Sequence, residues 1–318
     1  MRVKPLVKGL LTFVPGSHLF LPKKKSDGGA HCAAYCYGVW LEHLTMLREN
    51  GLRDIPDTLA ELGPGDSLGV GLAAMLSGVN NYYALDVLQH SETELNLKIF
   101  DELVEMFKAR AGRPEKGCPD FDCYLDENLF PSHILTQDVL RASLSEHRLD
   151  RIRRLIAGQV DDASAAKMSL QYVAPWFDDS LLKEGSVDVI LSHSVLEHVI
   201  DLEDAYVIMY KWLKPGGFIS NFIDLRAHGV DKIENGHWKY SELLWKAILG
   251  KRPYLINRLP YSMHRSFAEG AGFRLVCDLK QYITNGINRR QLARRWKDLS
   301  DDDLACMGAF MQARKDAL

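Results

Sequence analysis

Hydrophobic residues recur along the chain in two patterns, which predict two kinds of element. Short apolar runs that end at turn residues indicate strands, and apolar residues three or four positions apart indicate helices. The expected strands cover residues 58–62, 81–85, 168–173, 187–192 and 218–225, with one or two closing strands in 273–284; the expected helices cover 31–49, 67–76, 91–109, 138–158, 202–213 and 261–270. Strand and helix alternate through most of 57–284, which predicts an α/β fold with a doubly wound sheet. Asp66 or Ser67 is expected to cap the helix at 67–76, and Ser91 the helix at 91–109.

Composition narrows the class of protein. The chain is 47% hydrophobic and 25% charged with a net charge of −3, so it lacks the basic excess of a nucleic-acid binder. No apolar run approaches the ~20 residues that span a membrane. None of the six cysteines forms a C-x-x-C pair, so we expect reduced thiols in a cytoplasmic protein. The arm of residues 1–25 is expected to dock on the domain, with weak attachment to an anionic membrane surface as the alternative.

A glycine-rich turn follows the first expected strand. It reads Glu61-Leu62-Gly63-Pro64-Gly65, and the start of the next helix offers free N–H groups to a ligand. Asp86 ends the second expected strand about twenty residues later, where a carboxylate can accept hydrogen bonds from both ribose hydroxyls of an adenosine. A plain βα turn and a helix cap are the structural alternatives for these two features.

Two cofactors suit such a turn. A dinucleotide prefers G-x-G-x-x-G, and this pattern fails here because its third glycine position is Leu68. S-adenosylmethionine has no pyrophosphate and favours an acid before the glycines, such as Glu61, near its cationic end. The sequence therefore favours S-adenosylmethionine over a nicotinamide dinucleotide.

Two further motifs give the chain its resemblance to the class I S-adenosylmethionine-dependent methyltransferases. The stretch VDVILSHSVLEHV over 187–199 matches the fourth strand and the loop beyond it, and LKPGG over 213–217 matches the turn before the fifth strand. With the glycine turn and Asp86, these motifs lie in the family's order across 58–222. The resemblance implies a Rossmann-like, mostly parallel sheet of seven strands with helices on both faces. It also implies an N-terminal arm and helix over 1–55 and a methyltransferase domain over 56–318.

The resemblance also assigns the cofactor-binding residues. In the family, the turn holds the methionine and ribose of S-adenosylmethionine, whose product is S-adenosylhomocysteine, and the acid after the second strand binds the ribose. Many relatives carry an acid after the third strand for the adenine amine, whereas here the segment 172–176 reads YVAPW. Backbone groups near Ala174, or Asp178 further on, would have to serve. The expected cofactor residues are Glu61, Gly63, Pro64, Gly65, Asp86, Ala174 and His193.

Three residues are candidates for the reaction itself. His193 follows the fourth strand at the carboxyl edge of the sheet, where open α/β folds bind ligands. A hydroxyl acceptor usually needs a general base, most often histidine. Asp224 ends the fifth strand and His228 follows it, so this pair is a second candidate for a base and its orienting acid.

The loop after the fourth strand raises the question of a metal. Quinone-type O-methyltransferases carry E-x-x-E-H here, and its acids and histidine hold a metal. Ser194 stands in place of the first acid, which leaves the metal requirement uncertain. We assign no metal ligand and interpret Glu197 and His198 as a helix-opening pair.

The acceptor is the least determined part of the sequence. The insertions 111–160 and 226–260 are expected to shape its site, and the second is rich in aromatic and amide residues that suit a sugar or a polar ring, with core packing as the alternative. The stretch NGHWKYSELLWKAILGKRPYLINR resembles methyltransferases associated with bacterial surface-polysaccharide assembly. We therefore expect O-methylation of a small-molecule or glycan-precursor acceptor, by a monomer or a homodimer. The alternatives are a non-catalytic S-adenosylmethionine-binding protein and an NAD-dependent oxidoreductase.

Overall fold

The computed structural model describes residues 3–14, 29–113, 129–159, 168–252 and 255–316. The chain divides into two compact units. Unit 1 comprises Met1–Lys24, Ser194–Val207 and Asn221–Met311, and unit 2 comprises Lys25–His193, Ile208–Ser220 and Gln312–Leu318. Strands β5 and β7, whose bounds are given below, run from one unit into the other.

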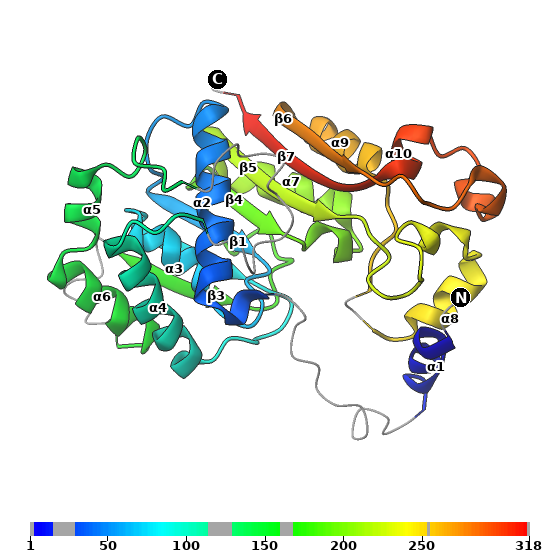
Figure 1. Cartoon of the computed structure of the whole chain (residues 1–318), viewed down its shortest axis with the longest axis horizontal. Coiled ribbons are helices and arrows are strands. Elements are labelled where there is room, and N and C mark those ends of the chain that lie inside the picture. Colours follow the sequence, from blue (N-terminus) through cyan, green and yellow to red (C-terminus); the bar gives the residue numbers. More distant parts are fainter. Residues whose placement is uncertain (1–2, 15–28, 114–128, 160–167, 253–254, 317–318) are drawn as a thin grey trace. The chain divides into compact units, whose positions relative to one another are not determined.

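A seven-stranded sheet in the order β3-β2-β1-β4-β5-β7-β6 organises the fold (Figure 1). β1 pairs in parallel with β2 and β4, and β2 pairs in parallel with β3. The register aligns Leu62 with Leu85 and Ser192, and Leu85 with Val173, so the carboxyl ends of these strands meet at one edge. The prediction of seven strands is confirmed, and the sheet is mixed, with one antiparallel pair. The strands are β1 Thr58–Leu62, β2 Asn81–Leu85, β3 Ser169–Val173, β4 Val187–His193, β5 Leu213–Asp224, β6 Phe273–Tyr282 and β7 Cys306–Lys315.

The helices follow the predicted order closely. All six predicted helical stretches are found, and 138–158 contains two helices, α5 and α6. The insertion 226–260 contributes α8 and a 3₁₀ turn, η5. The helices are α1 Val3–Leu11, α2 Ala33–Glu49, α3 Gly69–Leu76, α4 Thr93–Lys108, α5 Gln137–Ser143, α6 Glu146–Ile156, α7 Leu202–Trp212, α8 Glu242–Leu249, α9 Tyr261–Gly270 and α10 Asp301–Ala305, with 3₁₀ turns η2 Gly29–His31, η4 Leu196–His198, η5 Gly236–Lys239, η6 Arg289–Gln291 and η7 Arg294–Trp296.

Three local predictions were wrong. The N-cap of α4 is Glu92 rather than Ser91, and no side chain caps it. The N-cap of α3 is Leu68 rather than Asp66 or Ser67. The Leu68 N–H donates to Asn96 Oδ1 at 2.9 Å, and the Gly69 N–H donates to the Ser67 hydroxyl at 3.1 Å. β5 begins at Leu213, so the LKPGG stretch is the start of the strand and not a turn before it.

In unit 2, helix α3 packs closely against the sheet, and the space beside Gly71 is too small for a side chain. All eight residues of α3 are buried, and α2, α3 and α4 pack against one another. A Cβ atom added to Gly71 would lie 1.9 Å from Cζ of Tyr82 on β2. The glycine therefore lets α3 approach the phenol ring closely.

We expect Gly71→Ala to lower the free energy of unfolding by about 3 kcal/mol, because overpacking a dense core forces side chains and backbone apart. Urea-induced unfolding measures the change. Gly270→Ala is the matched control, since nothing lies within 4 Å of an added Cβ there. Equal stability of the two variants would contradict this packing.

Unit 1 has two apolar clusters of its own. One is centred on Trp238 and Trp296, and the other on Tyr240 and Trp245. Helix α1 packs on α8, where Gly9 lies so close that an added Cβ would reach the carbonyl oxygen of Ala247. The N-terminal helix thus docks on α8, as the arm was expected to do.

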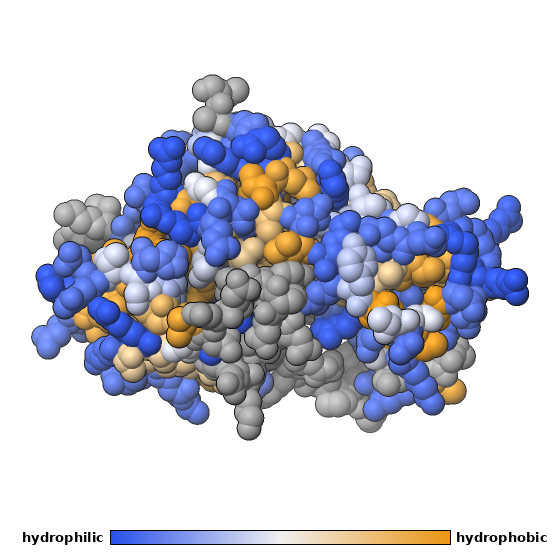
Figure 2. Space-filling model, turned by 45° about the horizontal axis from the view of Figure 1, so that its top comes forward, coloured by the Kyte–Doolittle hydropathy of each residue, from blue (hydrophilic) through white to orange (hydrophobic). Residues whose placement is uncertain are grey.

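On the face drawn in Figure 2, hydrophilic residues surround several separate hydrophobic patches. Several side chains of α1 and the residues after it are exposed, among them Val3, Leu10 and Phe13. Among the described residues, no helix combines the length and hydrophobicity needed to cross a bilayer.

Candidate active site

The glycine turn after β1 adopts a conformation that requires glycine. Gly63 and Gly65 have φ angles of 67° and 74°, in the left-handed region that other residues rarely adopt. Pro64 is buried between them. The Gly63 N–H donates to the Leu85 carbonyl at 2.7 Å, which ties the turn to the end of β2. Backbone groups of this turn can therefore approach a ligand at the carboxyl edge of the sheet.

Asp86 lies beside this turn, as the sequence predicted. Its Oδ2 accepts from the Gly65 N–H at 3.4 Å and its Oδ1 from the Val87 N–H at 2.7 Å. Burial raises the pKa of this carboxyl group, whereas the backbone hydrogen bonds lower it. The turn and the acid are thus joined by a hydrogen bond at the carboxyl edge of the sheet.

Glu61 lies in the interior. Its carboxylate accepts a hydrogen bond of 2.5 Å from the Tyr82 hydroxyl, and the residue is 4% exposed. Burial raises the pKa of Glu61 to about 7, although the hydrogen bond from Tyr82 opposes the shift. The Glu61 side chain therefore links β1, two residues before Gly63, to Tyr82 on β2 within the core.

This buried acid predicts a pH-dependent stability. The pKa of Glu61 is near 4.5 when exposed and about 7 in the folded protein, so between these values the folded state binds the proton more strongly. The free energy of unfolding should fall as the pH rises from 4.5 to 7, by about 3 kcal/mol from this group, and level off above 7. Urea unfolding of the wild type and Glu61→Gln across this range measures the difference. Parallel profiles for the two proteins would contradict the shifted pKa.

Ala174 follows β3 at the same edge as Asp86. The Tyr172 hydroxyl donates to the Leu88 carbonyl at 2.9 Å and accepts from the His90 N–H at 3.2 Å. These bonds hold the segment after β2 against β3. The Asp86 N–H donates to the Val173 carbonyl at 3.0 Å, so the residues that follow β2 and β3, Asp86 and Ala174, lie at neighbouring strand ends.

His193 ends β4 and belongs to a hydrogen-bond chain that sequence reasoning missed. Its Nδ1 lies 3.1 Å from Nε2 of His43, and Nδ1 of His43 lies 2.7 Å from the Ser220 hydroxyl. His43 is fully buried on α2, and burial holds its pKa well below the usual range, so it is neutral. The signal available in the sequence was a histidine within the stretch 39–47, whose other members are mostly apolar.

Gln312 on β7 also belongs to this chain. In one orientation of its amide, the nitrogen donates to the Met46 carbonyl at 3.0 Å and the oxygen accepts from the Ser220 hydroxyl at 2.8 Å. In this orientation Ser220 accepts from Nδ1–H of His43, and Nε2 of His43 accepts from Nδ1–H of His193. The same arrangement places the proton of a neutral His193 on Nδ1 and leaves the lone pair on Nε2.

Asp224 and His228 lie in unit 1 and form an ion pair. His228 Nε2 is 3.4 Å from Asp224 Oδ2, and Arg226 donates to both oxygens of Asp224 at 2.7 and 2.8 Å. Burial alone would raise the pKa of Asp224, but the hydrogen bonds from His228 and Arg226 outweigh it and lower the pKa. Burial likewise opposes the charge on His228, yet Asp224 raises its pKa overall. The pair brings together two predicted residues, with the histidine favoured in its protonated form.

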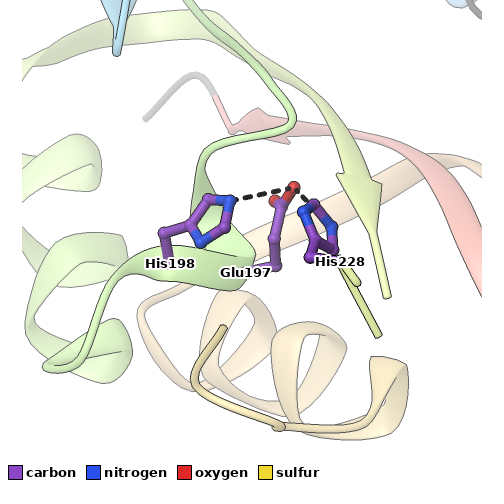
Figure 3. A group of neighbouring side chains, drawn as sticks. All are labelled: Glu197, His198 and His228. Atoms are coloured by element: carbon purple, nitrogen blue, oxygen red, sulfur yellow. Dashed lines mark ion pairs between the residues drawn. The ribbon is translucent and has the colours of Figure 1, made fainter. Parts of the chain in front are cut away.

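Glu197 and His198 also lie in unit 1, on η4, beside His228 (Figure 3). Glu197 Oε1 is 3.9 Å from His198 Nε2 and 4.0 Å from His228 Nε2. Burial raises the pKa of Glu197 to about 8, against the opposing effect of His228. The sequence did not predict this meeting, because His228 is about thirty residues further along the chain.

The aromatic residues of 226–260 are part of the core. Trp238, Tyr240 and Trp245 are 0, 3 and 6% exposed, so they offer no stacking surface to a ligand. Asn257 donates to the carbonyls of Leu196 and Val199 and is structural. Tyr254, another aromatic residue of this segment on which the expectation of a sugar or ring site rests, lies outside the described residues. Core packing, the alternative interpretation, is therefore the correct one for the described members.

The fold and the site define a class of enzyme. The chain has a Rossmann-like sheet with a glycine turn after β1 and an acid after β2, and folds of this kind bind their ligands at the carboxyl edge of the sheet. Residues 132–220 match the family model described as "Methyltransferase domain". The protein is an S-adenosylmethionine-dependent methyltransferase, and S-adenosylmethionine is its cofactor.

Solved structures of similar proteins include three methyltransferases. One, provisionally described as a sarcosine dimethylglycine methyltransferase of Galdieria sulphuraria, is 14% identical, with 88% of this chain and 85% of that chain covered and a TM-score of 0.44. An S-adenosylmethionine-dependent methyltransferase of Mesorhizobium loti is 13% identical, with 86% and 97% covered and a TM-score of 0.41. Phosphoethanolamine N-methyltransferase 2 of Haemonchus contortus, in complex with S-adenosyl-L-methionine, is 14% identical, with 89% and 56% covered and a TM-score of 0.41. At these scores the likenesses carry no part of the assignment. No curated protein is significantly similar to the chain.

Proposed function

We propose that the protein is an O-methyltransferase in which His193 is the general base. The observation that supports this most is the hydrogen-bond chain from Gln312 through Ser220 and His43 to His193, which leaves the lone pair on Nε2 of His193 when the Gln312 amide oxygen faces Ser220. His193 belongs to the same unit as the glycine turn and Asp86. His228 is a weaker candidate, because Asp224 raises its pKa and favours the protonated form.

The cofactor-binding residues we propose are those of the turn and the strand ends. Backbone groups of Gly63, Pro64 and Gly65 would hold the methionine and ribose, Asp86 the ribose hydroxyls, and Ala174 the adenine. Glu61 would keep the turn in place through Tyr82 rather than contact the cofactor.

The proposed reaction moves one proton and one methyl group. S-adenosylmethionine supplies an electrophilic methyl group when bound. His193 would accept the hydroxyl proton of the acceptor at Nε2 as the acceptor oxygen attacks the methyl carbon and the carbon–sulfur bond breaks. His43 would orient the imidazole and keep its proton on Nδ1. Asp224 and His228 form the second candidate pair of base and orienting acid, in unit 1.

A small polar acceptor, first a sugar or glycan precursor, is the substrate class we propose, with 226–260 shaping its site. The sequence resemblance to polysaccharide-associated methyltransferases supports this class, whereas the buried aromatic residues do not. A cytoplasmic location is part of the proposal, in keeping with Cys32, Cys36, Cys277 and Cys306, which form no disulfide within the described part of the chain. A homodimer is also part of the proposal, and light scattering would measure the molar mass in solution.

Release of S-adenosylhomocysteine from S-adenosylmethionine in the presence of sugars, sugar nucleotides and phenols tests the proposal. Each active hydroxyl acceptor is compared with its deoxy analogue, which should be inert. Activity with amines alone would contradict the O-methyltransferase. Tight cofactor binding with no product from any acceptor would favour the alternative, a non-catalytic S-adenosylmethionine-binding protein.

A further inference from the structure

A cluster of one carboxylate and two imidazoles lies in unit 1. Glu197, His198 and His228 each offer one ligand atom, and these three atoms all lie within 4.8 Å of one another. Figure 3 shows the three side chains pointing toward a common centre, two from η4 and one from the loop after β5. Ser194 stands where the quinone-type enzymes have an additional acid, so this set of side chains differs from theirs.

Glu197 is the unusual member of the cluster, because its carboxyl group is buried. Its side chain is 2% exposed, and neither of its carboxylate oxygens has a hydrogen-bond partner among the described residues. A buried carboxyl group without partners costs free energy, and this cost is removed when a cation binds it. The two histidines at 3.9 and 4.0 Å are too distant for hydrogen bonds but suit ligands that share an ion.

The backbone that carries the cluster is held firmly. Asn257 donates from its backbone N–H to the Glu197 carbonyl at 2.6 Å, and from its side chain to the carbonyls of Leu196 and Val199 at 3.0 and 2.8 Å. The contacts of Asn257 orient η4 before an ion binds. His228 Nε2 lies 3.3 Å from the Asp224 carbonyl oxygen and 3.4 Å from Asp224 Oδ2, so an ion bound at this nitrogen would replace these contacts and displace the proton that they favour.

We propose that Glu197, His198 and His228 bind a divalent first-row transition-metal ion. Two imidazoles and one carboxylate form the ligand set of catalytic zinc and of several non-haem iron sites. Bonds of ~2.0–2.2 Å would place neighbouring ligand atoms ~3.3 Å apart, so each side chain moves by less than about 1 Å. Three protein ligands leave coordination positions open for water or an acceptor oxygen.

An acceptor hydroxyl bound in an open position would lose its proton more easily, because the ion stabilises the alkoxide. This consequence rests on the proposed function. The binding of the ion does not, so the two are tested separately.

Titration of the metal-stripped, full-length protein with Co²⁺, followed by visible absorption, and with Zn²⁺, followed by calorimetry, tests the site. We expect one equivalent to bind. Glu197→Gln and His228→Asn should each weaken binding at least tenfold. His147→Ala, which removes an exposed histidine on α6, should bind as the wild type does.

Equal affinity in the wild type and Glu197→Gln, or no binding by the wild type, would overturn the proposal. Urea unfolding checks each variant, and Glu197→Gln should be at least as stable as the wild type without metal because it removes a buried acid. Binding of S-adenosylhomocysteine, measured on the same samples, shows whether the cofactor site is intact. Metal binding without cofactor binding would refute the proposed function alone, and the converse would refute the metal site alone.

Discussion

Asp86→Ala is expected to weaken the binding of S-adenosylmethionine and S-adenosylhomocysteine at least 100-fold. The carboxylate is held by the N–H groups of Gly65 and Val87 at the carboxyl end of β2, where it would accept hydrogen bonds from both ribose hydroxyls. Two hydrogen bonds to a charged group contribute about 3 kcal/mol or more, which is a factor of roughly 100 in affinity. Calorimetric titration measures the two dissociation constants.

The control for this variant is Asp101→Ala. Asp101 is exposed on α4 in the same unit and pairs only with Arg153 among the ion pairs described, so its loss should leave cofactor affinity unchanged. Asp86→Asn keeps one acceptor oxygen and should give an intermediate loss. Unchanged affinity in Asp86→Ala, with circular dichroism showing a folded protein, would contradict the assigned ribose contact.

The second large effect is expected from His193→Asn. Loss of a general base typically lowers turnover by 100- to 10,000-fold, and we expect kcat to fall at least 100-fold with a hydroxyl acceptor. Cofactor affinity should change far less than in Asp86→Ala. A His193→Asn enzyme with near-normal kcat would move the base to another residue, and the same assay on Asp224→Asn and His228→Asn would then locate it.

His43→Asn separates positioning from catalysis. His43 accepts from Nδ1–H of His193 and does not belong to the proposed acceptor site, so its loss should alter the ionisation of His193 more than it alters substrate affinity. We expect the acid limb of the pH profile of kcat/KM to shift, with KM nearly unchanged. If the variant only yields less folded protein, and the pH profile of kcat/KM of the folded fraction is unchanged, His43 contributes to packing alone.

Local patterns predicted the sheet because each strand is a short apolar run between turn residues. The bounds of β1 and β2 were predicted residue for residue, and Asp86 was placed beside the glycine turn. Parallel strands with aligned registers bring their carboxyl ends to one edge, so a linear order of motifs sufficed to locate these residues.

Local patterns and the order of motifs did not predict the contacts between segments that are distant in the sequence. β7 was missed, although Cys306–Lys315 contains an apolar run, because no neighbouring motif indicated a further strand. The chain through Gln312, Ser220 and His43 depends on that strand and on α2, which is about 150 residues from His193. The meeting of His228 with Glu197 likewise depends on the loop after β5, whose φ angles the sequence does not specify.

The aromatic residues of 226–260 show a different limit. Composition indicated a ring-binding site, but Arg258 packs at 4.3 Å from the ring of Trp245 and its N–H groups bond to the Tyr240 carbonyl and Glu242. The aromatic side chains thus surround a buried cation of the protein itself. Aromatic content alone does not distinguish such a core from a ligand platform.

The most direct test of the central claim is calorimetric titration of the purified protein with S-adenosylmethionine, S-adenosylhomocysteine and NAD. We predict micromolar binding of the first two at one site per chain, strong weakening of both in Asp86→Ala, and no binding of NAD. Binding of NAD alone, or of none of the three, would contradict the assignment of a methyltransferase that uses S-adenosylmethionine.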